Sequence, residues 1–462
     1  MRIIVVGGGI TGLTAAYLAD RAGHDVLCLE PRHPGGLLRT ERHEGFLCEV
    51  GPQAVLDNAP DTLALITLLG LEERALRANP AAARRFIYAR GRLHPLPASP
   101  PALLRSGLLS WSGKLRLLRE PFVRRPATPD DDETIAAFGA RRLGDEAART
   151  LLSTFVIGVF AGAADRLALA AALPRLAAME RTHGSLFRAL MQGRKRQRQD
   201  RSSPARAVRA RSLSFPDGIS ELPAALARAL GTRLRQKRAL GLAPRTGGGW
   251  RVTVEGAGAF PGAHEADAVV VTTEAAAAAA LLAPIVPEAA GLRTIETAPV
   301  AVCTLGFRDV AQRPLNMDLN GYGFLVARGE SPRMLGCQYE SSTFPGRAPE
   351  GQVLLRCILG GMGPGFDPGV VERPEGQIIE DTVRDLKVVA GLAREPDFVR
   401  VWRHPHGIPQ PRPGHLRMVA EVDAGLGRQP GLFLLGHAVR GVGVNESIRA
   451  ATAFAAGLPS PE

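Results

Sequence analysis

The chain has 462 residues, 45% of which are apolar, and a formal net charge of +12. This length allows two or three domains with a large core and excludes a small module held together by disulfides. The five cysteines have no paired spacing and the ten histidines include no H-E-x-x-H motif, so we expect reduced thiols in the cytoplasm and no metal site. Because the first apolar run is only a few residues long and ends in glycines, we expect neither a signal peptide nor a membrane-spanning segment.

The first thirty residues have the pattern of a dinucleotide-binding unit. A β-branched strand at 2–6 runs into G-x-G-x-x-G at 7–12, and a helix over 13–22 leads to a second strand at 25–29. The glycines allow a tight turn, close approach of a pyrophosphate and close helix packing, while the helix N-terminus attracts phosphate and the terminal acid can hold a ribose. The expected cofactor contacts are Gly7, Gly8, Gly9, Ile10, Thr11, Gly12 and Glu30.

A second glycine pair, Gly35–Gly36, follows the ribose acid and favours FAD over NAD. It precedes the segment 46–52 (FLCEVGP). This arrangement resembles FAD enzymes of the amine-oxidase type, in which such a pair lets the chain pass over the flavin diphosphate and ring. The spacer after the acid is one residue shorter than usual there. The resemblance adds Gly36, Leu37 and Gly51 to the expected FAD contacts.

The middle of the chain is predicted to be a hairpin followed by helices. Residues 84–97 predict two strands joined at Gly91, and helical patterns fill 100–199. The acidic run at 130–134 is interpreted as a helix cap rather than a metal cluster. Residues 181–211 carry ten basic residues against one acid, which fits a solvated linker, a contact with anionic lipid or a nucleic-acid patch. Few aromatic residues interleave with these charges, so we expect no nucleic-acid partner.

The α/β pattern returns after residue 204 and closes with a second glycine motif. A buried strand is predicted at 267–273, strand-rich sequence fills 298–360, and a helix occupies 375–392. A strand at 432–435 then leads to GVGVN at 441–445, which opens the last helix. In flavoproteins of this sort the N-terminus of that helix faces the pyrimidine edge of the flavin. The expected contacts are Gly436, Val442, Gly443 and Val444.

These patterns predict an α/β fold. It combines a discontinuous, Rossmann-like FAD-binding domain of the amine-oxidase type with an antiparallel-sheet substrate domain and a helical, membrane-associating region. The expected ranges are 1–83, 204–274 and 405–462 for the FAD domain, 84–98 and 275–404 for the substrate domain, and 99–203 for the helical region.

Across nearly its whole length the sequence resembles the oxygen-dependent protoporphyrinogen oxidases, especially the bacterial, myxobacterial-like kind. The arginine hairpin, GVFAG and GIPQ distinguish this family from other amine-oxidase-like flavoenzymes. The segments that carry the resemblance are GGGITGL at 7–13, VGP at 50–52, RRFIYARGRLHPLP at 84–97, GVFAG at 158–162, TAPVAVCTLGF at 297–307, GYGFLV at 321–326, STFPGR at 342–347, GIPQ at 407–410, GHL at 414–416 and GVGVNESI at 441–448.

The resemblance implies a role for single residues. Arg85 corresponds to an arginine that binds a substrate propionate, which suits a bidentate guanidinium. The backbone at Gly158 is expected to contact the macrocycle, and Ala239 lies near the strand that contacts the adenine. Departures from the family pattern occur at Gln338, where an aliphatic residue is usual, at His437 and at Glu446–Ser447. The expected substrate contacts are Arg85, Gly158, Leu325, Gln338 and Ile358.

The activity implied by the resemblance is the six-electron oxidation of protoporphyrinogen IX to protoporphyrin IX by FAD, with O₂ as acceptor and H₂O₂ as by-product. No side-chain general base is evident, so we expect the cavity to orient the substrate. The family is peripherally membrane-bound, which implies a location on the inner face of the cell membrane; a homodimer is compatible with the sequence. The alternatives are a coproporphyrinogen III oxidase on the same scaffold, an amine oxidase or polyene desaturase, and a non-catalytic flavin-binding or membrane-scaffold protein.

Overall fold

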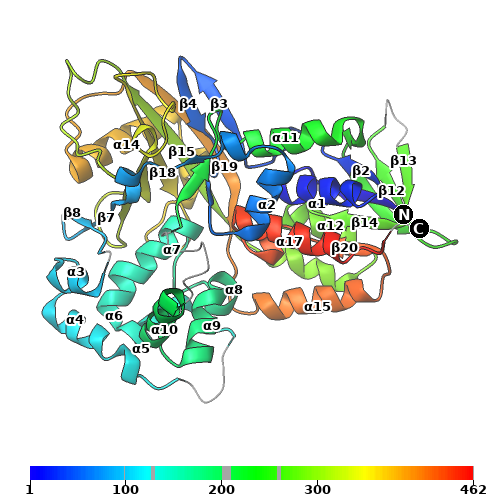
Figure 1. The fold of residues 1–462 in the computed structure, drawn as a ribbon, viewed down its shortest axis with the longest axis horizontal. Coiled ribbons are helices and arrows are strands. Elements are labelled where there is room, and N and C mark those ends of the chain that lie inside the picture. The colour runs from blue at the N-terminus through cyan, green and yellow to red at the C-terminus, as the bar shows by residue number, and fades with distance from the viewer. Residues whose placement is uncertain (98, 126–130, 200–209, 257–261, 461–462) are drawn as a thin grey trace.

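The computed structural model describes residues 1–97, 99–125, 131–199, 210–256 and 262–460. Figure 1 shows three parts: a parallel sheet covered by helices, a large second sheet and a group of helices below it. Both chain termini lie at the outer end of the parallel-sheet part. The first strand and the last helix therefore belong to the same part of the molecule.

The parallel sheet collects strands from the start, the middle and the end of the chain. Its order is β10-β2-β1-β14-β20, and every neighbouring pair is parallel. These strands are β1 (Arg2–Val6), β2 (Asp25–Leu29), β10 (Leu234–Arg235), β14 (Ala268–Val271) and β20 (Leu432–Leu434). Because β-branched residues fill β1 and β14 and both strands are buried, they occupy the centre of the sheet. The predicted discontinuous α/β fold is confirmed.

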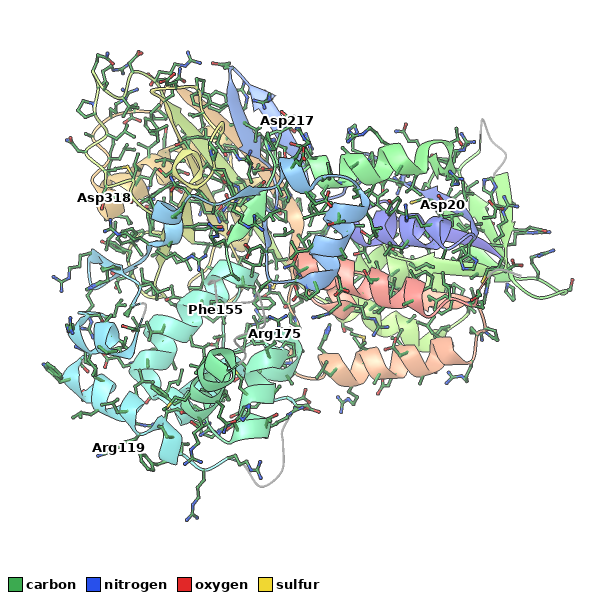
Figure 2. All side chains as sticks on the ribbon, in the orientation of Figure 1. Asp20, Arg119, Phe155, Arg175, Asp217 and Asp318 are labelled. Atoms are coloured by element: carbon green, nitrogen blue, oxygen red, sulfur yellow. The ribbon has the colours of Figure 1, made fainter. Side chains whose placement is uncertain are left out.

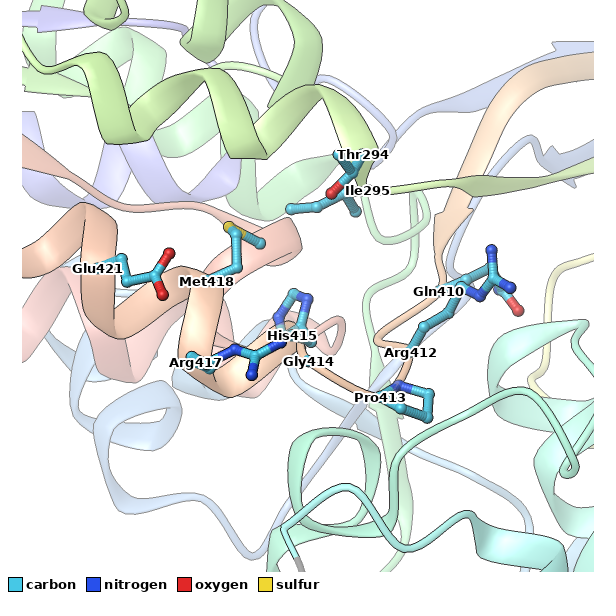
Figure 3. Close-up of a pocket in the computed structure, with 10 residues that line it drawn as sticks. All are labelled: Thr294, Ile295, Gln410, Arg412, Pro413, Gly414, His415, Arg417, Met418 and Glu421. Atoms are coloured by element: carbon cyan, nitrogen blue, oxygen red, sulfur yellow. The ribbon is translucent and has the colours of Figure 1, made fainter.

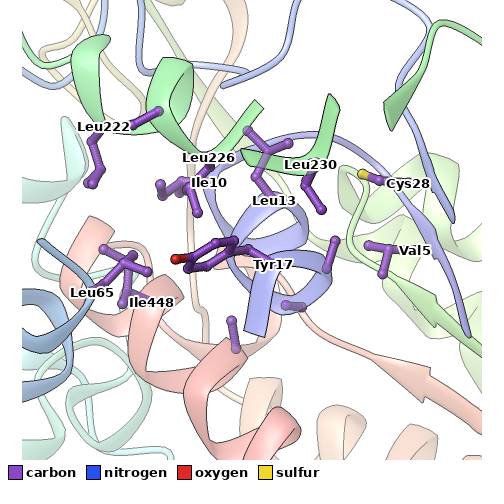
Figure 4. Close-up of a cluster of buried hydrophobic side chains, with 14 of the residues drawn as sticks. Val5, Ile10, Leu13, Tyr17, Cys28, Leu65, Leu222, Leu226, Leu230 and Ile448 are labelled. Carbon is purple, nitrogen blue, oxygen red and sulfur yellow. The ribbon is translucent and has the colours of Figure 1, made fainter. Parts of the chain in front are cut away.

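One face of this sheet is covered by α1 (Ile10–Arg21), α11 (Glu221–Leu230) and α17 (Val444–Ala456). Figure 4 shows Tyr17 of α1 at the centre of this core, between Leu226 of α11 and Ile448 of α17. The Tyr17 hydroxyl donates to the Leu68 backbone oxygen at 3.0 Å, so the buried ring keeps a polar partner. The N-terminal helix is thus fixed by the end of the chain, which brings the two glycine motifs into one domain.

The opposite face of the parallel sheet is covered by segments that the sequence patterns assign to the substrate domain. The core formed by Ile4 and Val6 of β1 includes Ala278, Leu282 and Leu292. The first two residues lie in α12 (Ala275–Leu282) and the last in η6 (Pro287–Thr294). The expected boundary at 274 therefore falls too early, because these apolar side chains are buried on the nucleotide sheet. The other elements on this side are α15 (His415–Gly427) and the three-stranded sheet β11 (Ala239–Pro244), β12 (Trp250–Val254) and β13 (Gly262–Ala266).

The second sheet has seven strands in the order β19-β15-β18-β17-β16-β7-β8. Their bounds are β7 (Arg85–Ala89), β8 (Arg92–Pro95), β15 (Thr297–Phe307), β16 (Gly323–Val326), β17 (Gly336–Tyr339), β18 (Val353–Gly360) and β19 (Phe398–Pro409). All neighbouring pairs are antiparallel except β7 with β16, which is parallel. The sheet is therefore mixed, and β19 runs through the expected boundary at 405.

The two faces of the second sheet differ in chemistry. One face packs on α14 (Glu375–Ala390) and contains Phe324, Tyr339 and Leu355, together with Cys303, Cys337 and Cys357. These three cysteines, like Cys28 in β2 and Cys48, are buried and free. Since side chains alternate along strands, the remaining face presents the other set of residues toward the rest of the molecule. That face carries the candidate site.

The helical part holds the elements α3 (Pro100–Arg105), α4 (Trp111–Leu118), η3 (Glu120–Phe122), α5 (Ile135–Leu143), α6 (Asp145–Ala147), η4 (Ala148–Leu152), α7 (Ser153–Phe160), α8 (Leu169–Ala172), α9 (Pro174–His183) and α10 (Leu186–Gln199). Thr134 caps α5 by accepting from the Ala137 N–H at 3.2 Å, so the predicted helix start is correct. Fully buried Arg142 pairs with Glu120 at 3.5 Å and with Glu180 at 2.7 Å. Among the described residues no helix is long and apolar enough to cross a bilayer. Residues 200–209 of the basic run, including the expected boundary at 204, lie outside the described residues.

The remaining elements connect these parts. They are β3 (Thr40–His43), β4 (Phe46–Glu49), β5 (Val55–Leu56), α2 (Pro60–Leu68), η1 (Glu72–Arg74), β6 (Leu76–Arg77), η2 (Pro80–Ala83), β9 (Ser212–Ser214), η5 (Gly231–Arg233), α13 (Glu340–Thr343), η7 (Pro368–Glu372) and α16 (His437–Arg440).

Candidate active site

The N-terminal glycines form a turn with open space beside it. A Cβ built on Gly9 meets nothing within 4 Å, whereas one built on Gly12 would lie 1.9 Å from the Gly7 backbone oxygen. Gly9 is the N-cap of α1 and no side chain caps this helix. The first N–H groups of α1 therefore keep their capacity to bind an anion. Glycine is therefore required at the two positions for different reasons. At Gly12 a side chain would collide with the backbone of Gly7, whereas Gly9 leaves room for a ligand.

Glu30 lies against this turn. Its carboxylate accepts from the Gly8 N–H at 2.8 Å and from the Arg32 N–H at 2.8 Å. Glu30, the predicted ribose acid, therefore lies directly after β2 and beside the glycine motif. Ala239, expected near the adenine, lies at the start of β11 and packs against the core behind β2. Its backbone pairs with Val254 rather than with a strand of the parallel sheet.

The second glycine pair, Gly35–Gly36, packs directly against the glycine turn at 7–12. The Gly35 N–H donates to the Gly8 backbone oxygen at 2.7 Å, and a Cβ on Gly36 would be 3.3 Å from the Gly9 Cα. A Cβ on Gly51 would lie 2.0 Å from the Leu37 backbone oxygen. Segments 35–37 and 51 thus converge on the open side of Gly9. A diphosphate bound at the N-terminus of α1 would extend along this open side.

The closing motif brings a second helix N-terminus to the same domain. α17 begins at Val444 after Gly443, and no side chain caps it. Gly436 follows β20 with a positive φ of 125°, and the half-buried Val442 packs against the core of the helical part. A Cβ on Gly443 would meet the Glu446 carboxylate at 2.1 Å, so this acid folds back over the turn. Glu446 therefore adds a negative charge at a helix start that otherwise favours anions.

The predicted substrate residues share one face of the second sheet. In strand register Arg85, Gly323, Gln338 and Arg356 form one row across β7, β16, β17 and β18. The neighbouring row contains Ile87, Leu325, Gly336 and Ile358. Both rows face away from the core under α14, because side chains on adjacent positions alternate. The structure therefore brings Arg85, Leu325, Gln338 and Ile358 together as a polar row beside an apolar row.

Gly158 reaches the apolar row from the helical part. A Cβ on Gly158 would lie 2.7 Å from Leu325 Cδ1, so α7 and β16 are in direct contact there. Ile157 of α7 belongs to the same apolar cluster as Ile358. Gln410 fastens α7 to the end of β19 by donating to the Phe160 backbone oxygen at 2.8 Å. GVFAG and GIPQ, two segments that distinguish the family in sequence, thus meet beside the apolar row.

Arg85 differs from its neighbour Arg84 in its contacts. Arg84 pairs with Asp318 at 3.6 Å, while no carboxylate lies within ion-pair distance of Arg85 among the described residues. The Arg85 guanidinium lies 5.0 Å from the centroid of the Tyr322 ring. Arg85 is therefore exposed, stacked on an aromatic ring and open to a carboxylate ligand.

The side chain of Gln338 is hydrogen-bonded to a neighbouring strand. Its side-chain oxygen accepts from Arg356 Nη1 at 2.6 Å. Arg356 also donates to the backbone oxygens of Glu49 at 3.0 Å and Gly51 at 2.6 Å. Gln338 and Arg356 thus tie the second sheet to the segment that carries Gly51. The amide oxygen of Gln338, a residue that departs from the family pattern, is therefore already bound by Arg356.

A buried acid completes this network and was missed in the sequence. Glu340 is fully buried at the start of α13, 4.0 Å from Arg356 Nε. Burial raises the pKa of Glu340, and the Arg356 and Arg347 charges oppose that shift. The Gln53 amide, with its nitrogen toward this acid, donates to the Glu340 carboxylate at 2.8 Å. The only sequence signal was that Gln53 directly follows VGP and that Glu340 follows a strand.

A hollow of about 540 Å³ lies between residues 294–295 and the segment 410–421 (Figure 3). It is lined by the end of β19 and the start of α15, including Gln410, Arg412 and His415, with Thr294 opposite. None of the predicted cofactor or substrate residues lines it. Gln410 is its link to the site, because the same side chain bonds the backbone of α7.

No metal centre is assembled in the described part of the chain, where no group of three His, Cys, Asp or Glu side chains converges. His404 Nε2 donates to the Val50 backbone oxygen at 2.9 Å, and burial lowers the pKa of His404. The arrangement as a whole is a phosphate cradle beside an apolar, arginine-flanked sheet face. These features fit a dinucleotide-dependent oxidoreductase.

Comparison with known proteins agrees with this geometry. The sequence pattern of the flavin-containing amine oxidoreductases matches residues 10–458, and the chain belongs to that family. The chain is 30% identical over 475 residues to protoporphyrinogen oxidase 1, chloroplastic, from Spinacia oleracea, with 98% of this chain and 83% of the relative covered. It is 27% identical to the coproporphyrinogen III oxidase of Bacillus subtilis, over 96% of this chain and 95% of the relative.

Among solved structures, a protein from Exiguobacterium sp. 255-15 assigned as a protoporphyrinogen oxidase superposes with a TM-score of 0.80. It is 27% identical, and 98% of each chain is covered. The resemblance to the protoporphyrinogen oxidase family and the amine-oxidase type of fold are therefore confirmed. The cofactor is FAD, and the residues present fit it: Gly9 leaves open space, the N-terminus of α1 lacks a side-chain cap, and Gly35–Gly36 approaches Gly9.

Proposed function

We propose that this flavoenzyme oxidises protoporphyrinogen IX to protoporphyrin IX, with O₂ as acceptor and H₂O₂ as by-product, in porphyrin biosynthesis. The observation that carries the proposal is the pairing of an arginine open to carboxylate binding, Arg85, with an apolar row that contains Leu325 and Ile358. A porphyrinogen has the matching chemistry, an apolar macrocycle with carboxylates on one edge. The relatives named for porphyrinogen oxidation add support.

FAD supplies the electron-accepting chemistry when it is bound. The chain's own residues bind and orient the substrate. Arg85 holds a propionate, Leu325 and Ile358 contact the pyrrole rings, and Gly158 leaves Leu325 the space that it occupies against α7. On the sheet face that carries the two rows, the buried carboxyl of Glu340 is engaged by Gln53 and Arg356, so we assign no general base to it. The sheet face acts by orienting the substrate.

The direct test is growth of porphyrin fluorescence with the purified protein in air, run in parallel on protoporphyrinogen IX and coproporphyrinogen III, with peroxide quantified. The proposal expects turnover of the first with stoichiometric peroxide. Arg85→Ala should raise KM by on the order of tenfold with a smaller change in kcat, because a lost charge-assisted bond costs roughly 1.5–3 kcal/mol. Arg84→Ala is the matched control and should leave KM near wild type. An unchanged KM in Arg85→Ala contradicts the anchor.

Coproporphyrinogen III is the second candidate substrate, since the Bacillus relative is named for it. It carries four propionates instead of two and would require more cationic groups. Arg356 lies in the same row as Arg85, but its donors are already bound by Gln338 and by the backbone of residues 49 and 51. One open guanidinium favours the substrate with fewer carboxylates. Preference for coproporphyrinogen in the parallel assay would reverse this assignment.

We further propose that the helical part binds the surface of the inner membrane, so that the enzyme is cytoplasmic and peripheral. An apolar stripe follows α4 and η3: Trp111, Leu115, Leu118 and Phe122 are 73%, 60%, 46% and 81% exposed. Their spacing places them on one side of a helix, beside cationic Arg119, which Figure 2 shows at the outer end of this part. An aromatic and leucine stripe next to arginine is typical of an interfacial helix.

Flotation with phosphatidylserine-containing vesicles tests this contact. Wild type should float with the lipid, and Trp111→Ser with Phe122→Ser should abolish flotation while leaving solution turnover unchanged. Leu240→Ser is the control, because Leu240 is 53% exposed on β11, far along the chain from the stripe. Absence of wild type from the lipid at every salt concentration contradicts the proposal. A protein that instead becomes monomeric only in the double variant would assign the stripe to a homodimer.

A further inference from the structure

Arg85 is held by a connected set of polar side chains that reaches into the core. We propose that Tyr322, Gln53 and Glu340 form a chain that positions the Arg85 guanidinium for a substrate carboxylate. The inference rests on the proposed function, because it concerns the anchor of that same site. It adds residues whose role is to position Arg85 rather than to touch the substrate.

The first link is the stacking of Arg85 on Tyr322. The guanidinium carbon lies 5.0 Å from the ring centroid. Arg85 of β7 is paired in register with Gly323, directly after Tyr322, so backbone pairing sets the ring and the arginine side by side. The backbone of Tyr322 is bonded to both neighbouring strands. Its N–H donates to the Arg84 backbone oxygen at 2.7 Å, and its backbone oxygen accepts from the Tyr339 N–H at 2.9 Å. The ring is thus a fixed platform, and a long arginine side chain gains a preferred position on it.

The second link orients the Tyr322 ring. Its hydroxyl is bonded to the Gln53 amide, and burial raises the pKa of Tyr322, so the phenol keeps its proton. Gln53 is 5% exposed, which leaves this amide few alternative partners. With the amide oxygen toward Tyr322, the phenol donates and the oxygen accepts. The direction of this bond depends on which way the amide points.

Two independent contacts decide the direction of the Gln53 amide. A carboxylate can only accept, so Glu340 requires the amide nitrogen of Gln53, at 2.8 Å. On the other side Arg356 can only donate, which turns the Gln338 oxygen toward Arg356 and the Gln338 nitrogen toward the Gln53 oxygen at 3.2 Å. Both contacts give the same orientation. The direction of the hydrogen bonds from Glu340 to Tyr322 is therefore set by two buried groups. Glu340 is 0% exposed and Arg356 is 5% exposed.

The consequence is that the anchor is coupled to the flavin segment. Gln53 follows Gly51 by two residues, and Arg356 donates to the Gly51 oxygen at 2.6 Å. One network therefore ties the backbone expected beside FAD to the aromatic platform under Arg85. A substrate carboxylate on Arg85 would therefore be held at a set distance from the cofactor segment.

The experiment compares binding of two porphyrins to the FAD-loaded enzyme, followed by flavin absorbance. Protoporphyrin IX carries free propionates, while its dimethyl ester has the same macrocycle with no carboxylate charge. Tyr322→Leu should weaken binding of the acid about two- to fivefold, the range expected for loss of a stacked cation, and leave the ester unchanged. Tyr322→Phe and Glu340→Gln should act in the same direction and by less. In an Arg85→Ala background, Tyr322→Leu should have no further effect on the acid.

A readout without porphyrin keeps the inference separate from the proposed function. Phenylglyoxal modifies arginines, and peptide mass spectrometry can follow Arg85 and Arg84 individually. Tyr322→Leu should increase the modification rate of Arg85 and leave that of Arg84 unchanged, because only Arg85 loses its platform. Equal weakening of acid and ester, additive effects in the double variant, or an unchanged Arg85 rate overturns the positioning role. If wild type binds neither porphyrin while the Arg85 rate responds, the proposed function fails and the positioning stands.

Discussion

The contrast between Gly9 and Gly12 gives the sharpest prediction about the cofactor site. Gly9→Ala adds a methyl group to open space at a φ of −70°, so the apoprotein should keep its stability within about 0.5 kcal/mol. Gly12→Ala places the same methyl group 1.9 Å from the Gly7 backbone oxygen and 2.5 Å from Thr272 Oγ1. Helix α1 would have to retreat by about 1 Å from β1, and such overpacking costs roughly 1–3 kcal/mol or more.

The two variants should therefore fail in different ways. Urea unfolding of the apoproteins measures stability, and quenching of FAD fluorescence measures cofactor affinity. Gly9→Ala should bind FAD at least tenfold more weakly at nearly unchanged stability, since a loss of about 1.4 kcal/mol corresponds to tenfold. Gly12→Ala should lose stability as well as affinity. A Gly9→Ala protein with wild-type FAD affinity would show that the open space beside Gly9 is not the path of the diphosphate. A Gly12→Ala protein of wild-type stability would refute the packing argument.

Two further predictions concern the substrate face and the effect of pH. Gly158→Ala should raise KM for the porphyrinogen several-fold by displacing Leu325, with stability changed by no more than about 1 kcal/mol, whereas Gly193→Ala in α10, where a Cβ meets nothing, should leave KM unchanged. Burial raises the pKa of Glu49 to about 7 despite its 3.1 Å contact with Arg347. Because the folded state then binds the proton more tightly than the unfolded chain, the contribution of Glu49 to stability is present below about pH 4.5 and is lost as pH rises through about 7. Denaturant titrations from pH 5 to 7.5 should show wild type losing stability relative to Glu49→Gln by on the order of 1 kcal/mol per pH unit, and a flat difference would contradict the raised pKa.

The site joins two kinds of interaction that serve different purposes. The cradle around Gly9 and Gly36 is built from backbone, so it depends on glycines and leaves little to side-chain chemistry. The substrate face is built from side chains on paired strands, where one register fixes several neighbours at once. A substitution at Gly9, where the backbone has open space, should therefore affect the cofactor alone. A substitution on the sheet face should affect the position of several residues together.

The local elements of the fold could be predicted from the sequence because they depend on neighbours along the chain. The strand at 2–6, the glycine turn and the following helix have their own periodicity and turn residues, and the helix starts only three residues before its expected position. The same holds for the hairpin across Gly91 and the helix at 375–390. Arg85 could be chosen over Arg84 only through the resemblance, since composition treats both as surface charges.

What the sequence alone determined was the class of cofactor and the set of glycines, because turn geometry and helix starts are local properties of the chain. Only the tertiary structure decided that Glu340, Gln53 and Tyr322 meet, since they come from segments separated by up to about 290 residues and join through strand pairing. It also decided that residues 275–294 pack on the nucleotide sheet, and that Gln338 is bound by Arg356 rather than exposed to the cavity. Long-range burial and register produce these contacts, and neither leaves a periodic signal in a single sequence.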